Sequence, residues 1–194
     1  MPIAVNGSGT ITRISVRGLP DGCVDTDTLP TSVTRGKILQ VVQTHLSTRL
    51  SNSTASGAEW SPSQLNTSIT PSATSSKVLI TAKVGIGFSV NTRRVFLKAF
   101  RDSTQIALGS EDTGNSSITR ASSSVDIRYD DVVEDIVFSF LDSPNTTSAT
   151  TYSFRFTHSQ TATATIYINR AHTRLNRVQD GHLSSNVTLQ EVAA

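Results

Sequence analysis

Apolar and polar residues alternate along much of the chain, and this alternation predicts β-strands. The longest regular run spans residues 76–89, in which every second position is apolar. The apolar members of that run are Val78, Ile80, Ala82, Val84, Ile86 and Phe88. Because successive side chains of a strand point to opposite faces, the run predicts a strand that buries one face.

Two further alternating runs lie between Thr150 and Ala171. Tyr152, Phe154 and Phe156 share one parity in the first run, and two isoleucines at 166 and 168 share one parity in the second. The segments TSAT and SQTA supply turn residues before and between the runs. We interpret this region as an antiparallel β-hairpin within a sandwich.

The remaining strand signals are spread evenly over the chain. They lie at residues 36–46, 65–70, 93–102, 105–110, 125–131, 132–143 and 186–192, with a polar loop at 49–63. Residues 93–102 and 105–110 suit a second hairpin, and residues 132–143 are apolar on both parities, which favours a central strand covered on both faces. No segment has a convincing helical period. Eight to nine strands predict an all-β fold, a two-sheet antiparallel β-sandwich or jelly roll.

The first 36 residues differ from the rest of the chain. Their apolar residues, which include Ile11, Ile14, Val16 and Leu19, are too few and too interrupted to form a core of their own. A turn sequence, LPDG, also breaks this segment. We therefore predict an extended N-terminal arm at residues 1–36 that docks on another surface, and a β-sandwich domain at residues 37–194.

Composition narrows the partners and the chemistry. One cysteine allows no internal disulfide, and no Cys/His spacing predicts structural zinc. The net charge is only +2, without a basic stripe interleaved with aromatic residues, so direct nucleic-acid binding is not expected. No segment has the apolar length that crosses a bilayer, so we expect a protein made in a cytosol that does not insert into membranes.

No motif predicts catalysis or a cofactor. The serines lack a GxSxG setting, the four histidines lack companion motifs, and no Gly-rich phosphate cradle is present. Two sets of polar residues resemble metal ligands only in type: the acidic set Asp130, Asp131, Glu134 and Asp135, and the loop set His172, Asp180 and His182. Neither has the spacing of a known site. We expect no catalytic, cofactor or metal site, and a binding or structural protein instead of an enzyme.

Two further candidates for contacts are Trp60 and Arg170. Trp60, in a polar loop, is a candidate for an interface anchor or a sugar-stacking platform, or else for a residue that covers the edge of the core. Arg170, in the segment INRA, is a candidate for a contact between chains or with a host.

Several segments carry a resemblance to a known class of protein. They are GSGTIT, GLPDG and VDTDTL near the start, SITPSATSSKVLI, FRDSTQIALGS and LDSPNTTSATTYSFRF in the body, and IYINR and SSNVTLQEVA near the end. Together they resemble small β-sandwich virion structural proteins of tailed phages of aquatic bacteria. Arg17 stands where such openings often have glycine.

The resemblance implies a homotrimeric sandwich of tumour-necrosis-factor-like shape, made in the host cytoplasm and located in the virion. One placement is a capsid decoration (cement) protein, which would bind the major capsid protein on the outer capsid surface and reinforce the shell. The alternative is a distal tail-fibre or tailspike module, whose loops would bind a host surface glycan or protein. Residue 36 runs almost directly into the sandwich, and this short reach favours decoration.

Overall fold

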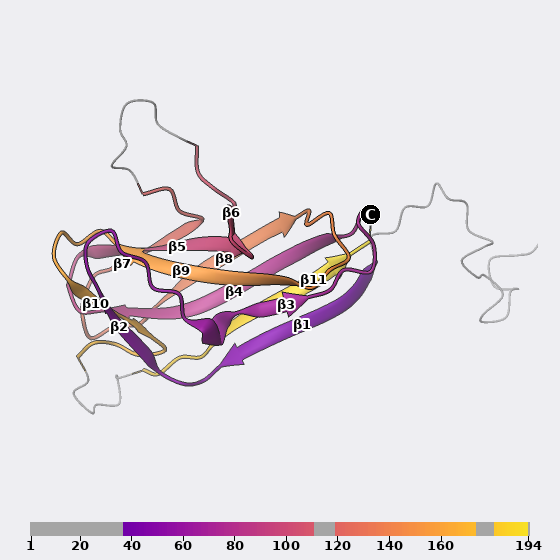
Figure 1. The fold of residues 1–194 in the computed structure, drawn as a ribbon. Coiled ribbons are helices and arrows are strands. Elements are labelled where there is room, and N and C mark those ends of the chain that lie inside the picture. Colours follow the sequence, from indigo (N-terminus) through magenta and orange to yellow (C-terminus); the bar gives the residue numbers. More distant parts are fainter. Residues whose placement is uncertain (1–36, 111–118, 174–180, 194) are drawn as a thin grey trace, which may run out of the picture. The chain divides into compact units, whose positions relative to one another are not determined.

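The computed structural model describes residues 37–110, 119–173 and 181–193 (Figure 1). The chain divides into two units, Met1–Arg35 and Gly36–Ala194. The predicted arm, with its docking candidates Ile11, Ile14, Val16 and Leu19, lies outside the described residues. The docking role of the arm stays a prediction.

Eleven strands and one short 3₁₀ turn, η1 (Ser63–Leu65), make up the described part of the chain. One sheet contains β1 (Ile38–Leu46), β2 (Leu50–Thr54), β4 (Lys77–Phe88), β8 (Glu134–Asp142), β10 (Ala164–Ile168) and β11 (Ser185–Val192). The other contains β3 (Thr67–Ile69), β5 (Arg93–Arg101), β6 (Thr104–Ile106), β7 (Ser123–Ile127) and β9 (Thr150–His158). All the pairings are antiparallel.

The strand order is that of a jelly roll. In the six-stranded sheet, β8 pairs with one edge of β4. The other edge of β4 pairs first with β11 and then with β10. Beyond them, β1 pairs with β11 and β2 pairs with β10. In the five-stranded sheet, β3 pairs with β9, β9 with β5, and β6 and β7 share the far edge of β5. Each sheet therefore has four strand columns, and the predicted two-sheet sandwich is confirmed.

The core lies between the two layers and follows the predicted parities. All six apolar residues of β4 named above are buried, as are Tyr152, Phe154 and Phe156 of β9 and both isoleucines of β10. The predicted hairpin of β5 and β6 is also present, with Arg101 opposite Thr104. Burial of alternate side chains from both sheets supplies most of the stabilisation of such a sandwich.

The predicted hairpin between Thr150 and Ala171 is wrong. β9 belongs to the five-stranded sheet, whereas β10 belongs to the six-stranded sheet and pairs with β2 and β4. The five residues 159–163 between them can reach about 16 Å, which is enough to cross the roughly 10 Å between packed sheets. Alternation fixes which side chains are buried, but it does not fix the partner strand.

The central position predicted for residues 132–143 is also wrong. β8 pairs only with β4 among the described strands, and its second parity is exposed, with Val137 at 62% and Leu141 at 46%. In addition, β2 lies inside the segment 49–63 that was predicted to be a loop. Its sequence, LSNST, is too polar to give a strand signal, and pairing with β10 holds it in place.

Asn169 lies where β10 ends and β11 takes its place beside β4. It follows β10 with a φ of 62° and is fully buried. Its Nδ2 donates to the carbonyls of Leu46 (2.8 Å) and Thr48 (3.0 Å), and its Oδ1 accepts from the hydroxyl of Ser185 (2.6 Å). One side chain thus links the ends of β1 and β10 to the start of β11. Asparagine suits this place because it tolerates a positive φ better than most residues.

Candidate functional site

Both ends of the sandwich unit meet at one end of the domain. The amide of Ala193 donates to the carbonyl of Lys37 at 2.8 Å, and Val192 lies between Ile38 and Lys77 in the sheet. We call this end the entry end, because residues 1–36 join the domain here. In Figure 1 it is the side that carries the C-terminal label, where β1 starts and β8 ends.

A row of three apolar residues and one glutamine crosses the outer face of the six-stranded sheet near the entry end. The register places Leu141 of β8 opposite Leu79 of β4, Leu79 opposite Gln190 of β11, and Gln190 opposite Val41 of β1. We call these four residues the outer row. Neighbouring strands lie about 4.8 Å apart, so the row extends over roughly 14 Å.

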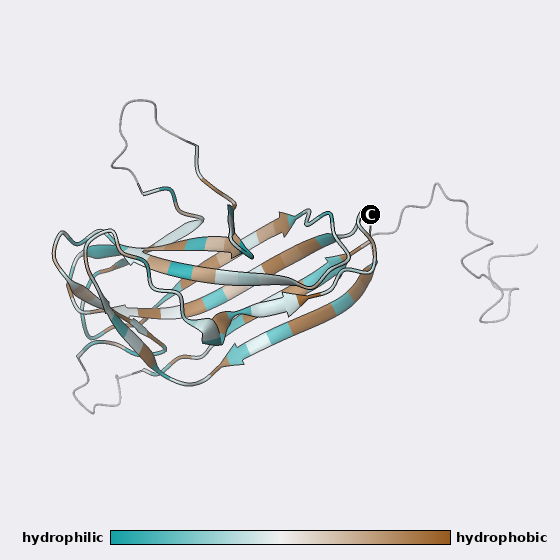
Figure 2. Ribbon diagram, in the orientation of Figure 1, coloured by the Kyte–Doolittle hydropathy of each residue, from teal (hydrophilic) through white to brown (hydrophobic). Residues whose placement is uncertain are grey.

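The two ends of the outer row, Val41 and Leu141, are exposed, whereas Leu79 and Gln190 between them are half-buried. Further apolar residues lie toward the entry end. Val41 is 57% exposed, and Ile38 and Leu39 at the start of β1 are also exposed because a bulge there breaks the alternation. Figure 2 shows hydrophobic residues along the first part of β1 and at the tip of β8. Exposed apolar side chains gathered at one end of a domain are typical of a protein contact site. It was missed from the sequence, where the only signal was the presence of apolar residues on both parities of these segments.

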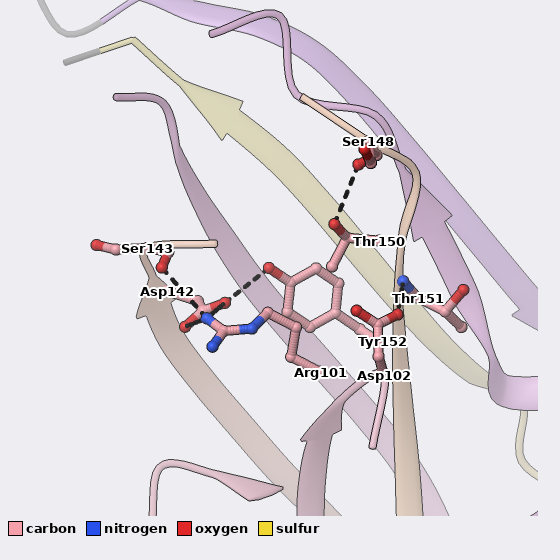
Figure 3. A network of polar contacts seen from close by, with 8 residues as sticks. All are labelled: Arg101, Asp102, Asp142, Ser143, Ser148, Thr150, Thr151 and Tyr152. Carbon is pink, nitrogen blue, oxygen red and sulfur yellow. Dashed lines mark hydrogen bonds and ion pairs between the residues drawn. The ribbon is translucent and has the colours of Figure 1, made fainter. Parts of the chain in front are cut away.

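A polar network ties the two sheets together at the same end (Figure 3). Arg101 of β5 donates from Nη1 to both carboxylate oxygens of Asp142 in β8, each at 3.0 Å. The hydroxyl of Tyr152 in β9 donates to Asp142 Oδ2 at 2.8 Å. Burial, and then the bond to the Asp142 carboxylate, raise the pKa of Tyr152 far above its ordinary value. The tyrosine therefore stays protonated as a donor.

A buried carboxylate holds the loop before β4. Glu191 accepts from the amide and hydroxyl of Ser72 (2.7 and 2.6 Å) and from Gln40 Nε2 (2.7 Å). Burial alone would raise the pKa of Glu191, but the hydrogen bonds from Ser72, Gln40 and Ser76 outweigh it and lower that pKa to about 2. Together with the tyrosine network, this makes the entry end a rigid support for the outer row.

The contact candidate Trp60 lies at the edge of the core. Its backbone makes two hydrogen bonds with Phe156, and the ring centroids lie 6.3 Å apart. The side chain is half-buried and packs against the core. The adjacent Glu59 bonds Lys98 at 2.6 Å and Arg155 at 3.2 Å. These contacts give Trp60 a packing role, and its role as an interface anchor stays a prediction.

The other contact candidate, Arg170, lies directly after Asn169. Its guanidinium carbon lies 4.2 Å above the ring centroid of Tyr167, a cation–π arrangement. The Tyr167 hydroxyl in turn lies 2.6 Å from His172 Nδ1. A contact of Arg170 with another chain or a host stays a prediction.

The two polar sets that match metal ligands only in residue type do not come together within the described ranges. No group of three or more His, Cys, Asp or Glu side chains there could hold a metal ion. Asp130 accepts from the hydroxyl of Thr173 at 2.7 Å, and Asp135 pairs with Lys83 at 3.1 Å. Asp180 lies outside those ranges.

A membrane-spanning helix is likewise not found among the residues that the structure describes.

Comparison with known proteins gives a distant likeness of fold. No protein-family model and no curated protein matches the chain. Among solved structures, it is similar to infectious bursal virus derived T=1 particles, with 9% identity and a TM-score of 0.43 over 79% of this chain and 39% of that one. It is also similar to the VP2 subviral particle of infectious bursal disease virus, with 12% identity and a TM-score of 0.42 over 79% and 41%. The chain thus spans about two fifths of those structures' length.

Proposed function

We propose that this protein is a phage virion structural protein, a trimeric capsid decoration protein that binds the outer capsid surface and reinforces the shell. The observation that carries the proposal is the group of exposed apolar side chains at the two ends of the outer row and at the start of β1. These side chains and the point where residues 1–36 join the domain lie together, so one end of the domain has the features of an attachment end.

The fold is compatible with this role. Jelly rolls form viral capsid domains, and they also form lectin domains, so the topology alone does not decide between functions. The described residues offer a rigid sandwich with a well-packed core and no cluster of metal-ligand type. A protein that only reinforces a capsid shell needs little more than a stable fold and a surface that contacts the shell. The sequence resemblance to phage virion proteins supports the same conclusion.

Trimerisation would strengthen attachment to a capsid. Each copy would contribute one outer row and one N-terminal segment with the apolar residues Ile11, Ile14, Val16 and Leu19. Linked contacts of this kind increase the overall avidity by orders of magnitude without any single strong contact. The protein would then have two partners: the major capsid protein and other copies of this chain.

Immunogold labelling of intact virions with an antibody to this protein tests the placement. Label spread over the head is expected for a decoration protein. Label confined to the tail would overturn the proposal and favour the alternative, a tail-fibre or tailspike module that binds the host surface.

A truncated protein lacking residues 1–36 tests the arm. We expect it to remain a folded trimer by circular dichroism and light scattering, yet to lose binding to empty capsids in a sedimentation assay. Undiminished binding by the folded truncation would show that the arm has no docking role.

A further inference from the structure

A polar pocket lies at the end of the domain opposite the entry end. Its volume is about 290 Å³, and it is lined by Thr92, Arg93, Arg94, Asp126, Ser159, Gln160 and Thr161. These residues come from the β4–β5 loop, the start of β5, β7 and the β9–β10 loop. β4 starts at the entry end and runs for 12 residues toward the pocket, which places the two ends about 36 Å apart.

The two arginines of the pocket differ in their partners. Arg94 pairs with the carboxylate of Asp126, with Nε at 2.9 Å from Oδ1 and Nη2 at 3.3 Å from Oδ2. Arg93 instead donates only to neutral oxygens, from Nε to Gln160 Oε1 at 3.4 Å and from Nη1 to the Thr92 carbonyl at 3.2 Å. No carboxylate within the described residues forms an ion pair with Arg93. Its Nη2 group therefore remains able to donate charge-assisted hydrogen bonds to an anion.

The backbone beside Arg93 is held in an uncommon conformation. Thr92 has a φ of 57°, in the left-handed region that β-branched residues rarely adopt. The strand that follows is fixed by two further bonds, because the Arg94 amide donates to Ser159 Oγ and the Ser159 amide donates to the Arg94 carbonyl, both at 2.9 Å. Strained backbone positions persist where the surrounding structure holds them, and they are concentrated at ligand-binding sites.

We propose that the pocket around Arg93 binds a saccharide that carries a carboxylate, such as a uronic acid residue. The Arg93 guanidinium would hold the carboxylate. The hydroxyls of Thr92, Ser159 and Thr161 and the amide of Gln160 offer donors and acceptors for sugar hydroxyls, and the lining contains no hydrophobic side chain that would favour an apolar ligand. The acidic Asp126 is neutralised by Arg94, so it does not repel an anion.

The position of the pocket agrees with a ligand outside the particle. If the entry end contacts a capsid, the opposite end points toward the medium. Weak single sites on many copies would then act together on a polysaccharide. The proposal for the pocket nevertheless does not depend on capsid attachment, because free protein in solution can be tested.

Ligand-observed saturation-transfer NMR on the full chain tests the site, with glucuronic acid as probe and glucose and sulfate as comparison ligands. We expect glucuronic acid to bind, glucose to bind at least about tenfold more weakly, and sulfate not to compete at equal concentration. Arg93→Gln should raise the Kd for glucuronic acid at least about tenfold, since it removes a charge-assisted contact. Lys77→Gln, which removes the same charge at the entry end, should leave that Kd unchanged.

Each alternative result overturns the proposal. Equal binding of glucose would remove the role of the carboxylate, and effective competition by sulfate would indicate a general anion site. The proposal would also be excluded if Arg93→Gln left the affinity for glucuronic acid unchanged, or if the wild-type protein did not bind glucuronic acid at all. Arg93 is exposed, so the variant should fold, and its melting temperature checks this. A second variant, Gln160→Leu, should weaken binding as well, because the amide is lost while the charge remains.

Discussion

Asn169 Nδ2 donates to the carbonyl of Leu46 at 2.8 Å, which joins two residues that lie 123 positions apart in the chain. The bond links the end of β10 to the end of β1. The same side chain satisfies Thr48 and Ser185, so three backbone or hydroxyl groups depend on it. Buried polar groups that lose their partner cost more free energy than an average hydrogen bond supplies.

We therefore predict that Asn169→Ala lowers the free energy of unfolding by about 3 kcal/mol, measured by urea denaturation. Asn145→Ala is the matched control, because Asn145 also has a positive φ (54°) but is exposed. The control should cost about 1 kcal/mol, the backbone effect alone. Equal losses in the two variants would show that the buried hydrogen bonds of Asn169 contribute little.

The link between the sheets at the entry end gives a second prediction. Tyr152→Phe removes the hydroxyl that donates to Asp142 and leaves the Arg101–Asp142 pair in place. We expect a loss of about 1–2 kcal/mol in the free energy of unfolding. Tyr129→Phe, at a residue that is 63% exposed, should change stability by less than about 0.5 kcal/mol. Similar values for both tyrosines would contradict a stabilising role for the network.

Glu191 predicts how stability depends on pH. Its pKa is about 2 in the folded protein against an ordinary 4.5, so below pH 4.5 the unfolded chain takes up a proton that the folded chain does not. This contribution is fully present above pH 4.5 and is lost as the pH falls toward 2. The stability difference between wild type and Glu191→Gln should therefore narrow over that window, as measured by urea midpoints. Glu134→Gln, at an exposed position of β8, is the control variant and should change stability at neutral pH by less than about 0.5 kcal/mol.

The outer row predicts a separation of binding from stability. Val41→Thr and Leu141→Thr keep the strand shape and alter side chains that are already exposed, so the melting temperature should hardly change. Binding to empty capsids should fall at least about tenfold when the apolar contact is lost. Val137→Thr, on β8 but outside the row, should bind like wild type. Equal loss in all three variants would assign the effect to the whole sheet face instead of the row.

The sequence contained most of the burial pattern but, apart from the local β5–β6 hairpin, not the pairing. Alternation in β4 and β9 identified Ile80 and Phe154 as core residues, because a two-residue period is a local property of the chain. Which strand lies beside which depends on contacts between distant segments, so the β9–β10 hairpin was predicted wrongly. β2 was not predicted because its own sequence is polar and only pairing with β10 holds it in a strand conformation.

The candidate sites show the same limit. The outer row exists only through the register that places Val41, Leu79 and Leu141 on one line, and the pocket exists only through the approach of Gln160 to Arg93. Single residues such as Trp60 stand out in a sequence by rarity, whereas these surfaces are built from ordinary residues. Only the topology brings them together.

The pairing of β1 with β11 has a consequence for biosynthesis. β11 lies between β1 and the first part of β4, so the sheet cannot close until the last ten or so described residues have left the ribosome. Nascent chains would expose β1 and its apolar residues throughout translation, and long-range pairing of this kind makes folding slow. Premature termination even shortly before residue 185 would remove an inner strand, and such fragments should aggregate.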